Sequence, residues 1–117
     1  MNNPTALPVD AMANARAIAR DLAKSADEVE RTRRIPADLL ARMHELRLCK
    51  MLLPKSTGGD EIHPGLYLQC IEELSQHNSS VGWNVFVANS AALIAPYLEP
   101  ETAQMVFGPP NALVAWG

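Results

Sequence analysis

Residues 81–95 form a segment that is apolar on nearly every side, and this segment strongly limits how the chain can fold. Its polar interruptions are Asn84, Asn89 and Ser90. A helix of this composition has almost no face suited to water and must be surrounded by other elements. The segment is also shorter than the ~20 apolar residues that span a bilayer. We therefore expect residues 81–95 to be the central helix of a bundle rather than a membrane span.

Four further segments carry the signals with which helices begin. A polar N-cap accepts hydrogen bonds from the first turn, and a proline in that turn loses no hydrogen bond because its nitrogen would be unpaired there. With the central segment included, the predicted starts lie at Asp10, Pro36, Pro64, Ser79 or Ser80, and Pro100. The first of these helices is amphipathic, with apolar positions that recur every three or four residues up to Val29. The sequence thus predicts an all-α fold, an orthogonal or irregular bundle of four to five helices over residues 10–110.

The two ends of the chain are expected to lie outside this bundle. We expect residues 1–9 to be disordered or extended; they lack the cationic start and the apolar run of a secretory signal, so the cytoplasm is the expected compartment. Residues 112–116 have the apolar character of a β-strand, but the chain offers this strand no partner. We expect residues 111–117 to be the start of a truncated β domain, which would make this chain a piece of a longer protein.

Composition and residue spacing argue against several functions. The chain has 117 residues, 48% of them hydrophobic, and a net charge of -3, so it offers no general basic field for nucleic acid. Cys49 and Cys70 have no C-x-x-C spacing and are expected to be buried thiols in a reducing compartment. His44, His63 and His77 do not combine with them at a short zinc-finger spacing. We expect no nucleic acid, no membrane and no metal.

A series of short motifs occurs in the order and spacing of one protein family. In chain order, the motifs are Arg33-Arg34-Ile35-Pro36 before Leu39-Leu40, Leu46-Arg47-Leu48, Pro54-x-x-x-Gly58-Gly59, Ile71-Glu72-Glu73-Leu74, and Asn78-Ser79-Ser80-Val81-Gly82-Trp83. Together they resemble the amino-terminal domain of the acyl-CoA dehydrogenase superfamily of flavoproteins over roughly residues 12–117. Trp83 favours similarity to the branch of flavin-dependent aromatic monooxygenases. Two positions differ from the pattern: Arg47 stands where the family usually has a helix-ending glycine, and Ala91 stands near a histidine of many hydroxylases.

The resemblance implies the architecture and activity of a larger protein. In that family a helical domain precedes a middle β domain and a carboxy-terminal four-helix bundle, usually in a homotetramer, with FAD or FMN held mainly by the latter two. The implied reaction is dehydrogenation of an acyl thioester (acyl-CoA) or hydroxylation of an aromatic substrate, the latter with reduced flavin from a partner flavin reductase. The present chain would form one wall of the substrate cavity and part of the oligomer scaffold. It would contain no catalytic residue and would bind flavin weakly or not at all.

Four residues in or directly before the central segment are candidates for substrate binding. Trp83 can form a wall against an aromatic or acyl substrate, because its broad rigid face buries much area; an ordinary core tryptophan is the alternative. Ser80 can direct its hydroxyl into a pocket or cap the helix. Asn84 and Asn89 need partners, because burying an unpaired amide costs roughly 1–3 kcal/mol. Either a ligand or a neighbouring helix can supply those partners.

The charged residues leave a second function open. Arg31, Arg33 and Arg34 either meet a phosphate, such as that of CoA or flavin in another subunit, or form a solvated helix end. Glu72 and Glu73 are adjacent on a helix, so they point in different directions and cannot act together as acid and base. The alternative to the flavoenzyme is a self-contained helical interaction or regulatory domain without catalysis, whose arginines contact an acidic partner or DNA.

Overall fold

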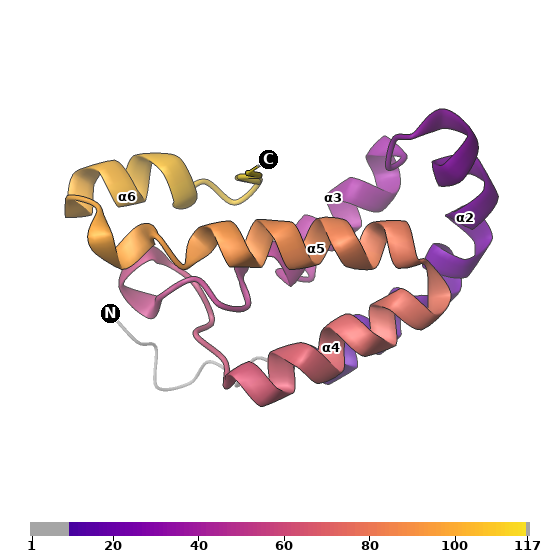
Figure 1. The fold of residues 1–117 in the computed structure, drawn as a ribbon, viewed down its shortest axis with the longest axis horizontal. Coiled ribbons are helices and arrows are strands. Elements are labelled where there is room, and N and C mark those ends of the chain that lie inside the picture. Colours follow the sequence, from indigo (N-terminus) through magenta and orange to yellow (C-terminus); the bar gives the residue numbers. More distant parts are fainter. Residues whose placement is uncertain (1–9, 117) are drawn as a thin grey trace.

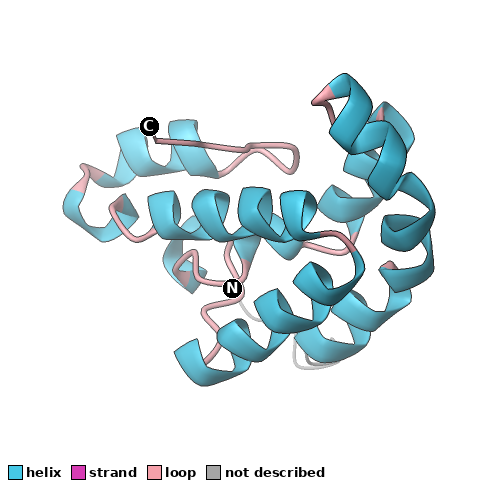
Figure 2. Ribbon diagram, turned by 45° about the vertical axis from the view of Figure 1, so that its right-hand side comes forward, coloured by secondary structure: helices cyan, strands magenta, loops and turns pink. Residues whose placement is uncertain are grey.

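Helix α5 (Ser79–Ala92) crosses the middle of the structure (Figure 1), and helices α2 and α4 pack against it. The structure is a computed structural model that describes residues 10–116. In chain order, the other α-helices are α1 (Ala11–Ala17), α2 (Ala19–Thr32), α3 (Ala37–Glu45), α4 (Pro64–His77) and α6 (Pro100–Phe107). Short 3-10 helices lie at Leu48–Lys50, Lys55–Thr57 and Ala95–Tyr97. The all-α prediction is confirmed, and Figure 2 shows helices and loops over the described range.

The helix starts follow the predicted residues with two differences. Asp10 caps α1 by accepting a hydrogen bond from the Ala13 N–H at 2.9 Å, but the predicted first helix is divided, because Ile18 separates α1 from α2. The predicted serine cap of α5 is wrong. Asn78 lies in an extended conformation before the helix, and its Oδ1 accepts from the Val81 N–H at 3.2 Å. Asn78 also donates to the Leu22 carbonyl at 3.3 Å, so the cap joins α5 to α2.

The core consists of two clusters that α5 connects. The larger cluster contains the buried apolar side chains of α1 to α5, among them Ile18, Leu22, Leu74, Val81 and Val85. The smaller cluster lies between the end of α5 and α6, and its members are Leu53, Ala92, Ala95, Ala103 and Phe107. Helix α5 therefore has the central place that its composition predicted. It is not enclosed on every side, however, because the side chains of Trp83 and Asn84 are exposed.

The ends of the chain add little to this core. Residues 112–116 are irregular in the structure, because no other part of residues 10–116 is a strand that could pair with them. That residues 111–117 begin a β domain stays a prediction. The segment predicted to be disordered or extended, residues 1–9, lies outside the described residues. Between residues 10 and 116, no helix combines the length and the apolar content needed to cross a membrane.

Candidate functional site

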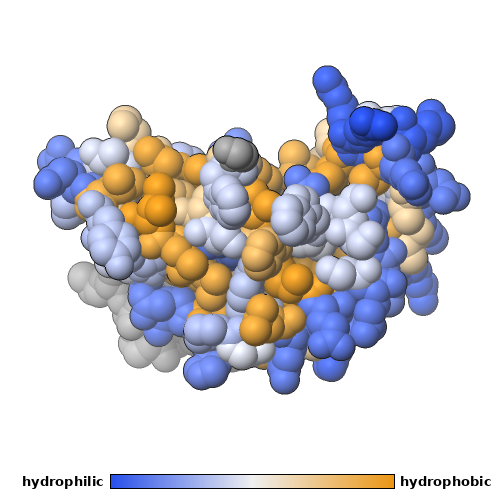
Figure 3. All heavy atoms as spheres, viewed as in Figure 1, coloured by the Kyte–Doolittle hydropathy of each residue, from blue (hydrophilic) through white to orange (hydrophobic). Residues whose placement is uncertain are grey.

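An open groove of about 590 Å³ lies where α2 ends and α5 begins. We call it the α2–α5 groove; its lining residues are Val29, Glu30, Arg33, Arg34, Ile35, Ser79, Ser80, Trp83 and Asn84. In Figure 1 the start of α5 and the end of α2 lie on the same side of the molecule, with the end of α2 above, and Figure 3 shows mainly hydrophilic atoms over that side. A concave site with an aromatic wall and a few polar groups has the general composition of a small-molecule site. Three of the four predicted site residues thus meet in one groove.

The turn that ends α2 positions the basic side of the groove. Arg33 has left-handed backbone angles, with φ at 56°, and its N–H donates to the Val29 carbonyl at 2.7 Å. The Thr32 hydroxyl donates to the Glu28 carbonyl at 2.8 Å and accepts from the Arg34 N–H at 3.3 Å. These bonds stop the helix and hold two consecutive arginines at the groove.

Trp83 forms the aromatic wall and is not a core residue. Its side chain is 64% exposed, which contradicts the interpretation of an ordinary core tryptophan. The ring stacks on Phe86, one turn further along α5, with the ring centroids 5.5 Å apart and the planes at 28°. A second hollow of about 200 Å³, lined by Ile71, Gly82 and Phe86 among others, lies on the α4 side of the same ring. Trp83 therefore separates two surface hollows.

Ser80 and Asn84 lie beside Trp83 with capacity for further hydrogen bonds. The Asn84 amide donates to the Ser80 carbonyl at 2.8 Å, so its nitrogen is already used in part. No residue between 10 and 116 donates to the Asn84 Oδ1 or bonds the Ser80 hydroxyl. Both side chains can therefore bond a ligand without breaking an existing contact.

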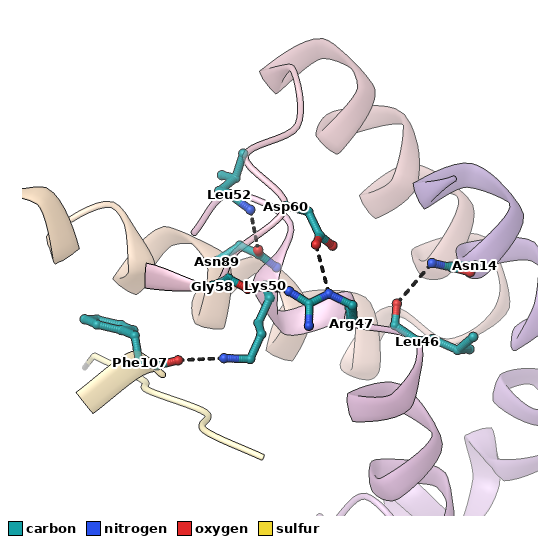
Figure 4. Close-up of polar contacts among 9 residues, drawn as sticks. All are labelled: Asn14, Leu46, Arg47, Lys50, Leu52, Gly58, Asp60, Asn89 and Phe107. Carbon is teal, nitrogen blue, oxygen red and sulfur yellow. Dashed lines mark hydrogen bonds and ion pairs between the residues drawn. The ribbon is translucent and has the colours of Figure 1, made fainter. Parts of the chain in front are cut away.

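Asn89 lies elsewhere, in the centre of the protein. It is 0% exposed, and its amide nitrogen donates to the Leu48 carbonyl at 2.8 Å and to the Val85 carbonyl at 2.9 Å. Its Oδ1 accepts from the Leu52 N–H at 3.0 Å (Figure 4). Asn89 thus lies away from the groove, and backbone groups of the protein satisfy its amide. This matches the second alternative for Asn89, in which a neighbouring element and not a ligand supplies the partners.

The sequence reasoning missed a charged network between α3 and α6. Arg47 has φ at 59°, its Nε donates to Asp60 Oδ1 at 2.9 Å, and its Nη2 donates to the Gly58 carbonyl. Lys50 is 5% exposed, and its Nζ donates to the Phe107 carbonyl, at the end of α6, at 2.6 Å (Figure 4). Burial, and secondarily the charge of Arg47, lowers the pKa of Lys50. A basic residue inside the otherwise apolar run 48–53 was the signal for this contact.

The two cysteines do not form a reactive site. Both lie buried as free thiols. Burial raises the pKa of Cys49 to about 11 and also raises that of Cys70. Because the thiolate is the nucleophilic form, neither residue is suited to thiol chemistry at neutral pH. Ala91 lies near the position where many hydroxylases carry a histidine. It is buried, and its methyl side chain offers no imidazole there.

The family profile described as "Acyl-CoA dehydrogenase, N-terminal domain" matches residues 10–105. The chain belongs to this family. It is 27% identical over 92 residues to the pigment production hydroxylase of Rhodococcus erythropolis, an alignment that covers 79% of this chain and 23% of that protein. It is 26% identical over 92 residues to the indole-3-acetate monooxygenase of Acinetobacter baumannii, covering 79% of this chain and 24% of that protein. The aligned region therefore spans about a quarter of the length of these curated relatives.

Proposed function

We propose that this chain forms one wall of the substrate cavity, and part of the homotetramer scaffold, in a flavin-dependent monooxygenase of the cytoplasm. The observation that carries the proposal is the exposed ring of Trp83 on the α2–α5 groove, in a chain whose family match covers that groove. Exposure of so large a side chain on the central helix leaves apolar area in water, which a bound aromatic molecule would remove. Ser80 and Asn84 would orient that molecule through hydrogen bonds.

The names of the two relatives favour oxygenation over dehydrogenation. One is a hydroxylase and the other a monooxygenase, and the substrate in the second name is an aromatic acid. In such a reaction, one oxygen atom of O₂ would enter a ring C–H bond, and the two electrons and two protons of reduced flavin would convert the other to water, leaving oxidised flavin. We accordingly propose an aromatic small molecule as the substrate, in preference to an acyl-CoA, and a flavin reductase as the partner that supplies electrons.

The described residues fit one face of a flavin or substrate site but do not enclose either. The groove offers the aromatic wall of Trp83 and two arginines. Among the described residues, one buried side-chain oxygen lacks a hydrogen-bond partner, Asp60 Oδ2. A carboxylate oxygen repels a phosphate, so it does not suit a flavin phosphate. We therefore propose that FAD or FMN is held mainly by other parts of the protein and that this chain binds and orients the substrate. None of its residues is assigned a catalytic role.

The test is a matched pair of substitutions in the intact protein that carries this chain. With reduced FMN or FAD supplied by a flavin reductase and with aromatic acids as substrates, we expect Trp83→Ala to lower kcat/KM at least about 10-fold, equivalent to about 1.4 kcal/mol. Leu68→Ala is the control, because Leu68 is similarly exposed (59%) but does not line the groove. Equal effects of the two substitutions, or activity on acyl thioesters alone, would contradict the proposal.

A further inference from the structure

We propose that the α2–α5 groove selects planar aromatic molecules that carry an anionic group, with the ring against Trp83 and the anion against Arg33 and Arg34. This inference rests on the proposed function, because it names the ligand class of the same groove. The shared chemistry is an aromatic ring joined to a carboxylate or a phosphate. The source of that anion, a small aromatic acid or the phosphate of a flavin, is distinguished by the experiment below.

Within the described residues, the two arginines of the groove form no ion pair with a carboxylate, whereas Arg42 and Arg47 each do. Arg42 lies 3.6 Å from Asp21, and Arg47 lies 2.9 Å from Asp60. Among residues 10–116, no ion pair reaches Arg33 or Arg34. A guanidinium group presents several N–H donors in one plane, which matches the two oxygens of a carboxylate or phosphate. Both residues thus have donors available for an anion in the groove.

The local charge of the groove differs in sign from that of the chain. Its charged lining residues are Arg33, Arg34 and Glu30, so two positive charges and one negative charge leave a net of about +1. The whole chain has a net charge of -3. The groove is therefore locally positive although the chain as a whole is negative, and this local charge favours an anionic ligand over a neutral one. Glu30 limits the preference and disfavours ligands in which negative charge lies near its carboxylate.

The arrangement of the arginines and the tryptophan sets the shape of the ligand. The arginines come from the turn after α2, whereas Trp83 lies about one turn into α5, on the other wall. A ligand that contacts both walls must have a flat apolar part and a charged end. The groove volume of about 590 Å³ lies within the usual range for small-molecule sites. Ser80 and Asn84 supply polar contacts at the same wall as the ring.

The test compares pairs of ligands that share a ring system and differ in whether they carry an anionic group, with two-dimensional ¹H–¹⁵N NMR of the 117-residue chain as the readout. The indole N–H of Trp83 reports binding, and Trp116→Phe assigns that signal because the chain has two tryptophans. The first pair is 4-nitrophenylacetic acid and its neutral amide; the second pair is FMN and riboflavin. We expect the anionic member of at least one pair to bind about 3- to 10-fold more tightly. A preference within the first pair identifies a small aromatic acid, and one confined to the second pair identifies a flavin phosphate.

Substitutions then assign the preference to the arginines. Arg33→Gln and Arg34→Gln should each reduce the preference for the anion, and the double variant should abolish it while the neutral ligand still shifts the Trp83 signal. Arg31→Gln is the control, because Arg31 lies in the same basic segment but does not line the groove. Equal affinity for both members of both pairs, or an equal effect of Arg31→Gln, would overturn the inference. Anion selectivity without oxygenation by the intact protein would instead contradict the proposed function and leave this inference standing.

Discussion

Arg47 donates its Nε–H to Asp60 Oδ1 at 2.9 Å while its own backbone remains in the left-handed region, at φ 59°. This conformation suits glycine and costs other residues of the order of 1 kcal/mol. The side chain compensates by pairing with a carboxylate that is 6% exposed and by donating to the Gly58 carbonyl. The contact holds the loop between α3 and α4 against the end of α3. These side-chain bonds offset the backbone strain of an arginine at a position where the family usually has glycine.

Arg47→Gly should therefore destabilise the protein, although it relieves the backbone. Loss of the ion pair leaves the Asp60 carboxylate nearly buried without its cation, and we expect a net loss of about 1–2 kcal/mol, reduced by the partial exposure of Arg47. Urea denaturation measures the change. Adding Asp60→Asn to Arg47→Gly should recover most of the loss, because the uncompensated charge is removed. If Arg47→Gly alone stabilises the protein, backbone strain outweighs the ion pair and our account is wrong.

Asn89 and Asn84 lie on the same helix, but substitution of Asn89 should lower stability much more than substitution of Asn84. Asn89→Ala removes three hydrogen bonds to buried backbone groups, and we expect a loss of about 2–4 kcal/mol in the free energy of unfolding. Asn84→Ala, the matched control on the exposed side, should change stability by less than about 0.5 kcal/mol. Thermal or urea denaturation of both variants makes the comparison. Similar losses would show that the central contact between α5 and the segment around Leu48 is less important than the structure indicates.

Gly82 allows α5 to approach α4 closely. A Cβ atom at this position would lie 3.1 Å from the Ser75 Cα and would collide with the Ser75 hydroxyl. Gly82→Ala should destabilise the protein, because an overpacking cost of about 1–3 kcal/mol exceeds the gain in helix propensity of about 1 kcal/mol. Ser75→Ala, combined with Gly82→Ala, should restore part of the stability by removing the hydroxyl. A stabilised single variant, measured by urea denaturation, would mean that the two helices are not packed this tightly.

The buried thiol of Cys49 should make stability fall with rising pH. Its pKa is raised from 9.0 to about 11 by burial, so between these values the unfolded chain loses the thiol proton and the folded chain keeps it. The contribution of this thiol to the free energy of unfolding therefore falls by about 1.4 kcal/mol for each unit of rising pH across that window. Because Lys50 titrates with the opposite sign, the quantity to measure is the difference between the wild type and Cys49→Ala. A difference that stays constant from pH 9 to 11 would contradict the burial of this thiol.

The helical framework was predictable because its signals are local. Capping and proline positions placed most helix starts, as at Pro64 and Pro100, since these residues act through the backbone beside them. The cap of α5 was misassigned because three consecutive polar residues, Asn78 to Ser80, can each serve, and the tertiary contact of Asn78 with Leu22 decides between them. The strand expected over residues 112–116 could not form, because a strand depends on a partner that periodicity does not supply.

The site was predictable in part. Trp83, Ser80 and Asn84 meet in the groove because they lie close together at the start of one helix, which sequence spacing reveals. Arg33 and Arg34 join them from a different helix end, and no local pattern predicts that juxtaposition. Asn89 lies on the opposite side of α5 from the groove residues, against the segment that contains Leu48 and Leu52. Which side of an all-round apolar helix faces the core depends on the packing of the other helices.

Isotope labelling can show whether the protein that carries this chain performs the proposed flavin-dependent oxygenation. The intact protein that carries the chain is supplied with reduced FMN or FAD, ¹⁸O₂, unlabelled water and aromatic acids, and the products are analysed by mass spectrometry. We expect a hydroxylated product that contains one ¹⁸O atom, and a large loss of that product in the Trp83→Ala variant. A product oxygen that comes from water, or oxidation of acyl thioesters without incorporation of oxygen, would contradict it.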